Sequence, residues 1–218
     1  KHLAAAANRL RSSVAVHAVI KCLCTLSTKV LPAEGVPHIA FMSFCKYVEF
    51  VAKFAKQRSQ RHLPFVSNAL LGTGALCRYM DWKTTLGAFK DSQAAARMRM
   101  FDKYHGQMVE MCVGVLAHDE QEGVRRCALQ CLGGMLVHSP TLLLQEATSK
   151  LVKSALKGET DATAQQAVLE AFRVFLEEED REINLELRKG RPTTGAEAVK
   201  AQRVSSMSTS LANDYLAL

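Results

Sequence analysis

Aromatic residues are scarce in this 218-residue chain, and so are the strand-favouring clusters that a β-sheet needs. Phe, Trp and Tyr make up 6% of the residues, whereas the helix formers Ala and Leu are abundant. No run of ~20 apolar residues occurs without a charge, so the sequence has no pattern for a membrane-spanning helix. With 48% hydrophobic residues, the chain can still bury a core. We therefore expect an all-α protein that does not act in a membrane.

Recognisable catalytic and cofactor motifs are also missing. The sequence has no His-Glu-x-x-His, P-loop, Gly-x-Ser-x-Gly or Cys-x-x-Cys pattern, which argues against the well-defined hydrolase, nucleotide-binding and zinc classes. Cys22 and Cys24 diverge by about 200° on a helix and are poorly placed to chelate together. Cys127 and Cys131 share a helix face but fall on core positions. We expect no catalytic residues, metal, cofactor or small-molecule substrate, and therefore no enzyme.

The cysteines fit free thiols better than a disulfide framework. Their number is odd, and each lies among apolar residues in a helical pattern, at Cys22, Cys24, Cys45, Cys77, Cys112, Cys127 and Cys131. A free Cys in such a place behaves as a small hydrophobe. This usage suits a reducing compartment such as the cytosol or nucleus.

Positive charge is concentrated in the first half of the chain. The net charge is +7, but residues 1–110 hold sixteen Lys and Arg against six Asp and Glu. Residues 111–218 hold twelve against fifteen. A basic half can bind nucleic acid or an acidic protein surface, and charge alone does not choose between them.

Hydrophobic periodicity predicts a series of helices separated by Pro, Gly and polar breaks. The expected helical ranges are 3–30, 39–55, 63–80, 101–117, 120–138, 140–157 and 162–179. Asp119 and Glu122 have the spacing of a capping box, so we expect Asp119 to be an N-cap. Ser139 and Pro140 should end one helix and begin the next. The segment 81–99 is expected to be a long loop, with at most a short helix inside it.

Several of these segments repeat. A shift of 40 residues places Leu116 on Leu156, Val124 on Ala164, Leu129 on Leu169 and Leu132 on Phe172, and this period is typical of HEAT or armadillo units. An offset of 59 places Leu70 on Leu129 and Gly74 on Gly133. Gly72 and Gly74 each cost about 1 kcal/mol in an isolated helix, so they indicate a close helix–helix contact.

The repeat predicts a HEAT-type helical-hairpin solenoid, in which stacked hairpins share one continuous core. Residues 1–60 would form N-terminal hairpins, and residues 61–189 would form HEAT-like repeats with a basic insertion at 81–100. Residues 190–218 would form a loop and the start of a further repeat. The apolar stripe of this last segment has no expected partner, which indicates a section of a longer polypeptide.

Two groups of charged residues are candidate sites. The first group consists of five basic residues: Lys83, Lys90, Arg97, Arg99 and Lys103. Such a group can neutralise phosphates without reading base sequence, and the alternative is a solvated loop. The second is the pair Asp119 and Arg125. We expect this pair to form an inter-repeat ladder, with partner contact as the alternative.

Four segments, in their order and spacing, resemble the cohesin loader family of the Nipped-B type, also called the sister-chromatid cohesion loading factor. They are Gly74-Ala-Leu-Cys-Arg-Tyr-Met-Asp81, Gly123-Val-Arg-Arg-Cys-Ala-Leu-Gln-Cys-Leu-Gly-Gly-Met-Leu-Val-His-Ser-Pro140, Phe175-Leu-Glu-Glu-Glu-Asp-Arg181 and Ser205-Ser-Met-Ser-Thr-Ser-Leu211. The resemblance covers about residues 65–216 and concerns the C-terminal HEAT region of that family.

The resemblance implies a nuclear, chromatin-associated scaffold. Such a loader binds the kleisin subunit and SMC ATPase heads of cohesin, binds double-stranded DNA without sequence specificity, and stimulates the heads' ATPase while cohesin is loaded onto chromosomes. Its partner subunit would bind elsewhere in the full chain. The alternative is an unrelated HEAT adaptor that binds only proteins, of the transport-receptor or phosphatase-scaffold type.

Overall fold

The structure, a computed structural model, is helical throughout the part of the chain that it describes. It describes residues 12–30, 36–54, 63–87, 94–118, 121–139 and 146–158, together with 142–143, 162, 164–174 and 177. No strand occurs among these residues, which confirms the all-α class. The expected amphipathic segment at the C-terminus, within 190–218, lies outside the described residues.

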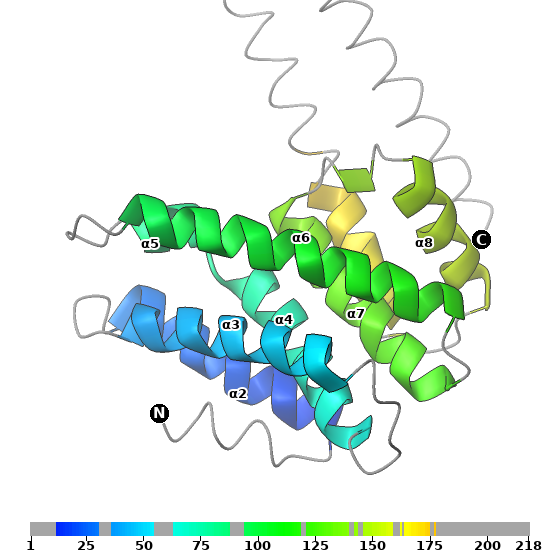
Figure 1. Ribbon diagram of the computed structural model, residues 1–218, viewed down its shortest axis with the longest axis horizontal. Coiled ribbons are helices and arrows are strands. Elements are labelled where there is room, and N and C mark those ends of the chain that lie inside the picture. Colours follow the sequence, from blue (N-terminus) through cyan, green and yellow to red (C-terminus); the bar gives the residue numbers. More distant parts are fainter. Residues whose placement is uncertain are drawn as a thin grey trace, which may run out of the picture.

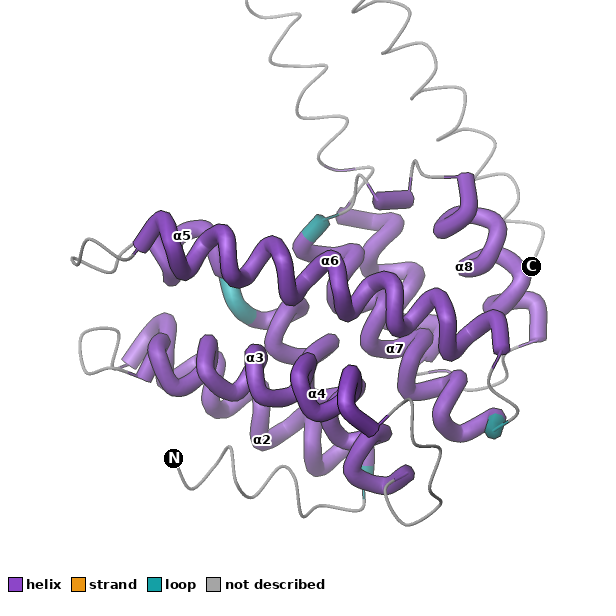
Figure 2. Tube along the Cα trace, in the orientation of Figure 1, coloured by secondary structure: helices purple, strands orange, loops and turns teal. Residues whose placement is uncertain are grey.

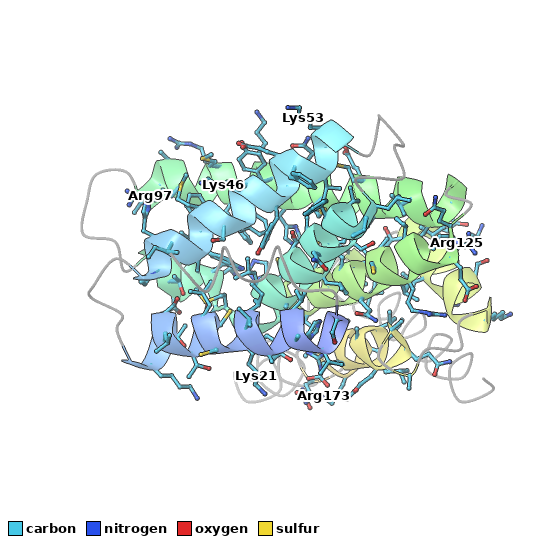
Figure 3. All side chains as sticks on the ribbon, turned by 90° about the horizontal axis from the view of Figure 1, so that it is seen from below. Lys21, Lys46, Lys53, Arg97, Arg125 and Arg173 are labelled. Carbon is cyan, nitrogen blue, oxygen red and sulfur yellow. The ribbon has the colours of Figure 1, made fainter. Side chains whose placement is uncertain are left out.

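The helices are arranged in three layers (Figures 1 and 2). Their bounds are α2 Ser13–Thr25, the π-helical turn η1 Leu26–Val30, α3 Val36–Phe54, α4 Leu63–Tyr79, α5 Trp82–Gly87, α6 Ala94–His118, α7 Glu122–His138 and α8 Glu146–Gly158. Residues 164–174 form a further helix, which we call the 164–174 helix. Figure 3 shows α3 and α6 along one face, α4 and α7 in the middle, and α2 with the 164–174 helix along the opposite face.

The central helices α4 and α7 are covered on all sides. Residues 68–77 of α4 and residues 128–136 of α7 form unbroken buried runs. Helices that lie on the surface of a protein normally keep a polar face toward water, so such runs require neighbours on every side. Helices α2, α3 and α7 pack against α4, while α6 packs against α7.

Glycine lets these central helices approach closely, as the sequence indicates for Gly74. A Cβ atom on Gly74 would lie 2.6 Å from the Cα of Cys131 on α7. A Cβ on Gly133, the residue that matches Gly74 at the offset of 59, would lie 2.7 Å from the backbone carbonyl carbon of Ala167. The two matched glycines therefore have the same role, because each faces the backbone of a helix that comes later in the chain.

An aromatic cluster joins three of the helices. The ring of Trp82 on α5 lies 5.5 Å from that of Phe44 on α3 and 5.0 Å from that of Phe101 on α6, measured between centroids. All three side chains are fully buried. Large buried aromatic rings contribute much of the hydrophobic stabilisation of a core. Trp82 therefore anchors the short helix α5 against α3 and α6. The helically spaced apolar residues of α3 form a buried stripe that belongs to the core: Phe41, Phe44, Cys45, Val48 and Val51.

The loop predicted over residues 81–99 is wrong at its C-terminal end, because α6 begins at Ala94 rather than at Phe101. The short helix allowed within this segment is present as α5. The residues from Ala94 to Arg99 are mostly good helix formers, and the partly buried Met98 packs against the core. These properties extend α6 toward its N-terminus by almost two turns.

Two predicted helix starts also differ from the structure. The N-cap of α7 is Gln121, which makes no side-chain capping bond, so Asp119 is not the cap, and Asp119 itself lies outside the described residues. The α7 helix ends at His138 as expected, but α8 begins at Glu146 instead of at Pro140. Between them the backbone N–H of Leu142 donates to the carbonyl of Ser139.

The predicted helix over 3–30 changes from α-helical to π-helical geometry at its C-terminal end, where η1 follows α2. Hydroxyl groups of Thr25, Ser27 and Thr28 each donate to the carbonyl oxygen four residues earlier, at 2.8–2.9 Å. Such side-chain bonds compete with the backbone ladder and favour local distortion.

Residues related by the shift of 40 have similar burial in two of the pairs compared, but the pair Leu129 and Leu169 differs. Val124 and Ala164 are both buried, as are Leu132 and Phe172. Leu169 is 49% exposed, whereas its counterpart Leu129 is 1% exposed. The difference arises because α7 is central, while the 164–174 helix lies in an outer layer and keeps a solvent face.

Candidate nucleic-acid interface

The predicted basic residues lie on helices rather than on a loop. Lys83 is exposed on α5, and Arg99 and Lys103 are exposed on α6. Arg97, also on α6, is half-buried, and Lys90 lies outside the described residues. The positions of these charges are therefore set by helix geometry.

Helix α6 separates its cations between two sides. Arg99 and Lys103 are four residues apart and share the outward side of the helix. Arg97 is rotated about 200° from Arg99 and lies on the same side as Tyr104, which is seven residues later. The Tyr104 hydroxyl donates to Oε1 of Glu49 on α3 at 2.6 Å, so this side of α6 faces α3.

Helix α3 adds two lysines that sequence reasoning did not assign to the site. Lys46 and Lys53 are exposed on α3, seven residues or about 10 Å apart along the helix. Figure 3 shows them with Arg97 along the face formed by α3 and α6. We call the surface of these two adjacent helices the α3–α6 face. Its cations are Lys46 and Lys53 on α3 and, on two sides of α6, Arg97, Arg99 and Lys103. The alternation of Lys with apolar residues in α3 signals a basic outer side, but the pairing of α3 with α6 is a tertiary feature.

Acidic residues are present on the α3–α6 face as well. Glu49 lies between the two lysines in the sequence of α3, while Asp102 and Glu110 are exposed on α6. The carboxylate of Glu49 is occupied by the Tyr104 hydroxyl and raises the pKa of that phenol to about 12. Five cations and three acids leave a modest positive charge. The face suits backbone contacts on an extended polyanion rather than a tight pocket for one anion.

Lys83 belongs to a different cluster, at the carboxyl end of α7. Burial lowers the pKa of the His138 imidazole, and the nearby Lys83 ammonium lowers it further, while Asp81 and Asp102 act in the opposite direction. Asp81 also caps α5, because its Oδ1 accepts a hydrogen bond from the Thr84 N–H at 3.1 Å. The structure therefore places Lys83 within a mixed-charge cluster.

The ladder of Asp119 and Arg125 remains a prediction, since Asp119 lies outside the described residues. Arg125 is half-buried in the first turn of α7, where its backbone N–H donates to the Gln121 carbonyl at 3.0 Å. The adjacent Arg126 pairs with Glu122 at 2.8 Å. Glu122 is favourably placed at the positive end of the helix dipole.

Five of the seven cysteines are buried, as expected for free thiols in the core, and Cys22 is the clear exception. Cys22 is exposed and Cys127 is half-buried, so Cys22 is not the buried hydrophobe that its apolar neighbours suggest. Within the described ranges, no group of three or more His, Cys, Asp and Glu residues could hold a metal ion. The helices of the same ranges include none with the length and apolar character needed to cross a membrane.

Comparison of the chain with protein-family models, with curated proteins and with solved structures finds no match.

Proposed function

We propose that this chain is a HEAT-type helical scaffold that holds double-stranded DNA on the α3–α6 face. The observation that carries the proposal is the presence of five cations on two helices, α3 and α6, that pack side by side. Phosphate contacts of this kind supply affinity without reading base sequence. Lys46 and Lys53 are separated by about 10 Å, which corresponds to roughly three base-pair rises along the duplex axis.

The solenoid part of the proposal rests on the hairpins and the glycines. Consecutive helices pack as the pairs α3 with α4 and α6 with α7, which is the unit that a HEAT array stacks. Gly74 and Gly133, matched by the offset of 59, each meet the backbone of a later helix, α7 and the 164–174 helix respectively. Burial of α4 and α7 on all sides then corresponds to a strongly curved stack, whose outer members α2 and the 164–174 helix cover the central pair.

We further propose that the scaffold is a section of a cohesin loader, acting in the nucleus on chromatin. The resemblance of four ordered segments supports this role, and two of them fall largely within α4 and α7. In this role the chain would contact the kleisin and SMC heads of cohesin and stimulate their ATP hydrolysis without catalysing a reaction itself. A protein-only HEAT adaptor is the alternative, favoured by the acids Glu49, Asp102 and Glu110 on the α3–α6 face.

Fluorescence anisotropy with a labelled DNA duplex at several salt concentrations tests the DNA-binding role. We expect Lys46→Glu and Lys103→Glu to weaken binding to all duplex sequences alike and to reduce the salt slope by about one unit each. Lys21→Glu and Lys157→Glu, which make the same charge change on α2 and α8, are matched controls and should bind like the parent chain. Equal losses in all four variants, or no duplex binding at low salt, would exclude the α3–α6 face and favour the adaptor.

The cohesin role needs its own measurement. ATP hydrolysis by purified cohesin should rise when the chain and duplex DNA are added together. If the chain binds DNA but neither binds cohesin nor changes its ATPase rate, the scaffold belongs to another class of HEAT protein.

A further inference from the structure

The surface formed by α2 and α4 carries positive charge without any acidic residue. The segments α2, η1 and α4 contain no Asp or Glu, whereas they contain Lys21, Lys29 and Arg78. The α3–α6 face, by contrast, mixes cations with acids. Figure 3 shows Lys21 on the side of the molecule opposite Lys46, Lys53 and Arg97, so this is a second and separate basic surface.

A half-buried tyrosine lies at the centre of this surface. The Nζ of Lys21 lies 5.5 Å from the centroid of the Tyr79 ring, and the Cζ of Arg78 lies 5.7 Å from it. The imidazole of His17 meets the same ring edge-on, with centroids 6.3 Å apart. Both cations are within the range of a cation–π interaction. We call His17, Lys21, Arg78 and Tyr79 the Tyr79 patch.

Among the described residues, the acid that senses the patch is already paired with an arginine outside it. Glu170 of the 164–174 helix is the carboxylate that feels Arg78, but it is already paired with Arg173 at 2.8 Å. Arg173 also pairs with Glu177. The three residues form an ion-pair network of their own, which leaves the cations of the Tyr79 patch to act on an external group.

Exposed apolar side chains occur on the helices that carry the patch or its neighbouring acid Glu170. Val14 is 73% exposed and shares one side of α2 with Lys21, seven residues later. Leu169 is 49% exposed and adjoins Glu170 in the sequence. Tyr and Arg are enriched at the energetically dominant positions of protein interfaces, and an apolar contact beside them is typical of such surfaces.

We propose that the Tyr79 patch binds an acidic peptide segment of a protein partner, with a carboxylate between Lys21 and Arg78 and an apolar side chain against Val14 or Leu169. Duplex DNA fits less well. It carries one charge per about 1.7 Å of its axis, so its phosphates would extend beyond the two cations toward the carboxylate of Glu170, which senses Arg78. A peptide can place its carboxylates over the cations alone. This inference does not depend on DNA binding by the α3–α6 face.

An NMR titration of the labelled 218-residue chain tests the inference with the synthetic peptide acetyl-(Glu-Leu-Glu)₃-amide. Resonances of α2 and of the end of α4 should shift, and the Gln-Leu-Gln analogue should leave them in place. We expect Lys21→Glu and Tyr79→Leu to weaken peptide binding about tenfold, whereas Lys46→Glu, the same charge change on α3, should not alter it.

Several outcomes would overturn the inference. They are an absence of shifts on α2, equal shifts with the Gln analogue, shifts that follow the α3–α6 face, and tighter binding of duplex DNA at the patch. The spectrum of each variant without peptide reports whether it is folded. Because Lys21 is exposed, peptide binding by Lys21→Glu still tests the inference even if Tyr79→Leu perturbs the packing of α4. Loss of DNA binding in Lys46→Glu with intact peptide binding would separate the two sites.

Discussion

A Cβ atom on Gly134 of α7 would overlap the carbonyl oxygen of Gly74 on α4. The two residues bring the central helices together backbone to backbone. Since no side chain lies between them, neither can be enlarged without moving a whole helix. The contact between α4 and α7 is thus the least adjustable part of the described core.

Substitution of these glycines should therefore destabilise the protein. We expect Gly134→Ala and Gly74→Ala to lower the free energy of unfolding by roughly 1–3 kcal/mol each, as for other overpacked cores. Urea denaturation followed by circular dichroism measures the change. Gly106→Ala is the matched control, because a Cβ on Gly106 in α6 meets nothing within 4 Å. There the helix preference of Ala should add about 0.5–1 kcal/mol. Similar stabilisation at all three positions would show that α4 and α7 are not in close contact.

Thiol chemistry should distinguish Cys22 from the other cysteines. A thiolate is the reactive form, and burial raises the pKa of Cys24 to about 12 and that of Cys45 to about 11. At pH 8 a disulfide reagent should modify the exposed Cys22 rapidly and the half-buried Cys127 more slowly. The fast phase should disappear in Cys22→Ser. Rapid modification of several thiols in that variant would contradict the packing described for α2 and α3.

Stability should depend on pH through His105 on α6. Its imidazole is 7% exposed, its Nε2 has no hydrogen-bond partner, and burial, with a further contribution from the nearby His138, lowers its pKa from 6.5 to about 4. The unfolded state then binds more protons than the folded state between these two values. Stability is therefore complete above about pH 6.5 and falls as the pH drops toward 4, by up to about 3 kcal/mol.

The contribution of His105 can be separated from that of the carboxylates by comparing variants. Denaturant midpoints of His105→Leu should fall less steeply than those of the parent chain between pH 6.5 and pH 4. An unchanged slope in His105→Leu would mean that this imidazole is not protected from protonation.

The hydrogen bond between Tyr104 and Glu49 should be visible in the titration of the phenol. The carboxylate disfavours a second negative charge beside it, so the pKa of Tyr104 should lie near 12 and should drop toward 10 in Glu49→Gln. A ¹³C label on the tyrosine ring allows this residue to be followed separately from the other three. Tyr104→Phe identifies its signal, and titration near pH 10 in the parent chain would show that α3 and α6 are not joined here.

The sequence predicts the type of most helices but not their full extent. The apolar stripe of α3 and the glycines of α4 carry clear local signals, and the structure confirms the core role of both. The segment 81–99 carries only a weak local signal for helix, because its charges and Gly87 are as compatible with a loop as with α5 and α6. Burial of Trp82 among aromatic rings decides this point, and it is a tertiary effect.

The cations of the α3–α6 face could be predicted from the sequence only in part, because their grouping also depends on tertiary packing. Arg97, Arg99 and Lys103 form a local group along the chain, and α6 keeps them together. Their combination with Lys46 depends on the packing of α3 beside α6, about 50 residues apart in sequence, which no local pattern encodes. The same holds for Lys21 and Tyr79, whose contact joins α2 to the end of α4.

The buried central pair has a consequence for synthesis on the ribosome. The α4 segment begins at Leu63 and its main neighbour α7 begins at Glu122, so α4 leaves the ribosome well before α7 exists. At ~5–20 residues per second this delay lasts about 3–12 s. During that interval α4 can pack against α2 and α3 but lacks α7, and the apolar surface left exposed favours aggregation. Newborn chains should therefore engage a chaperone between the emergence of α4 and that of α7.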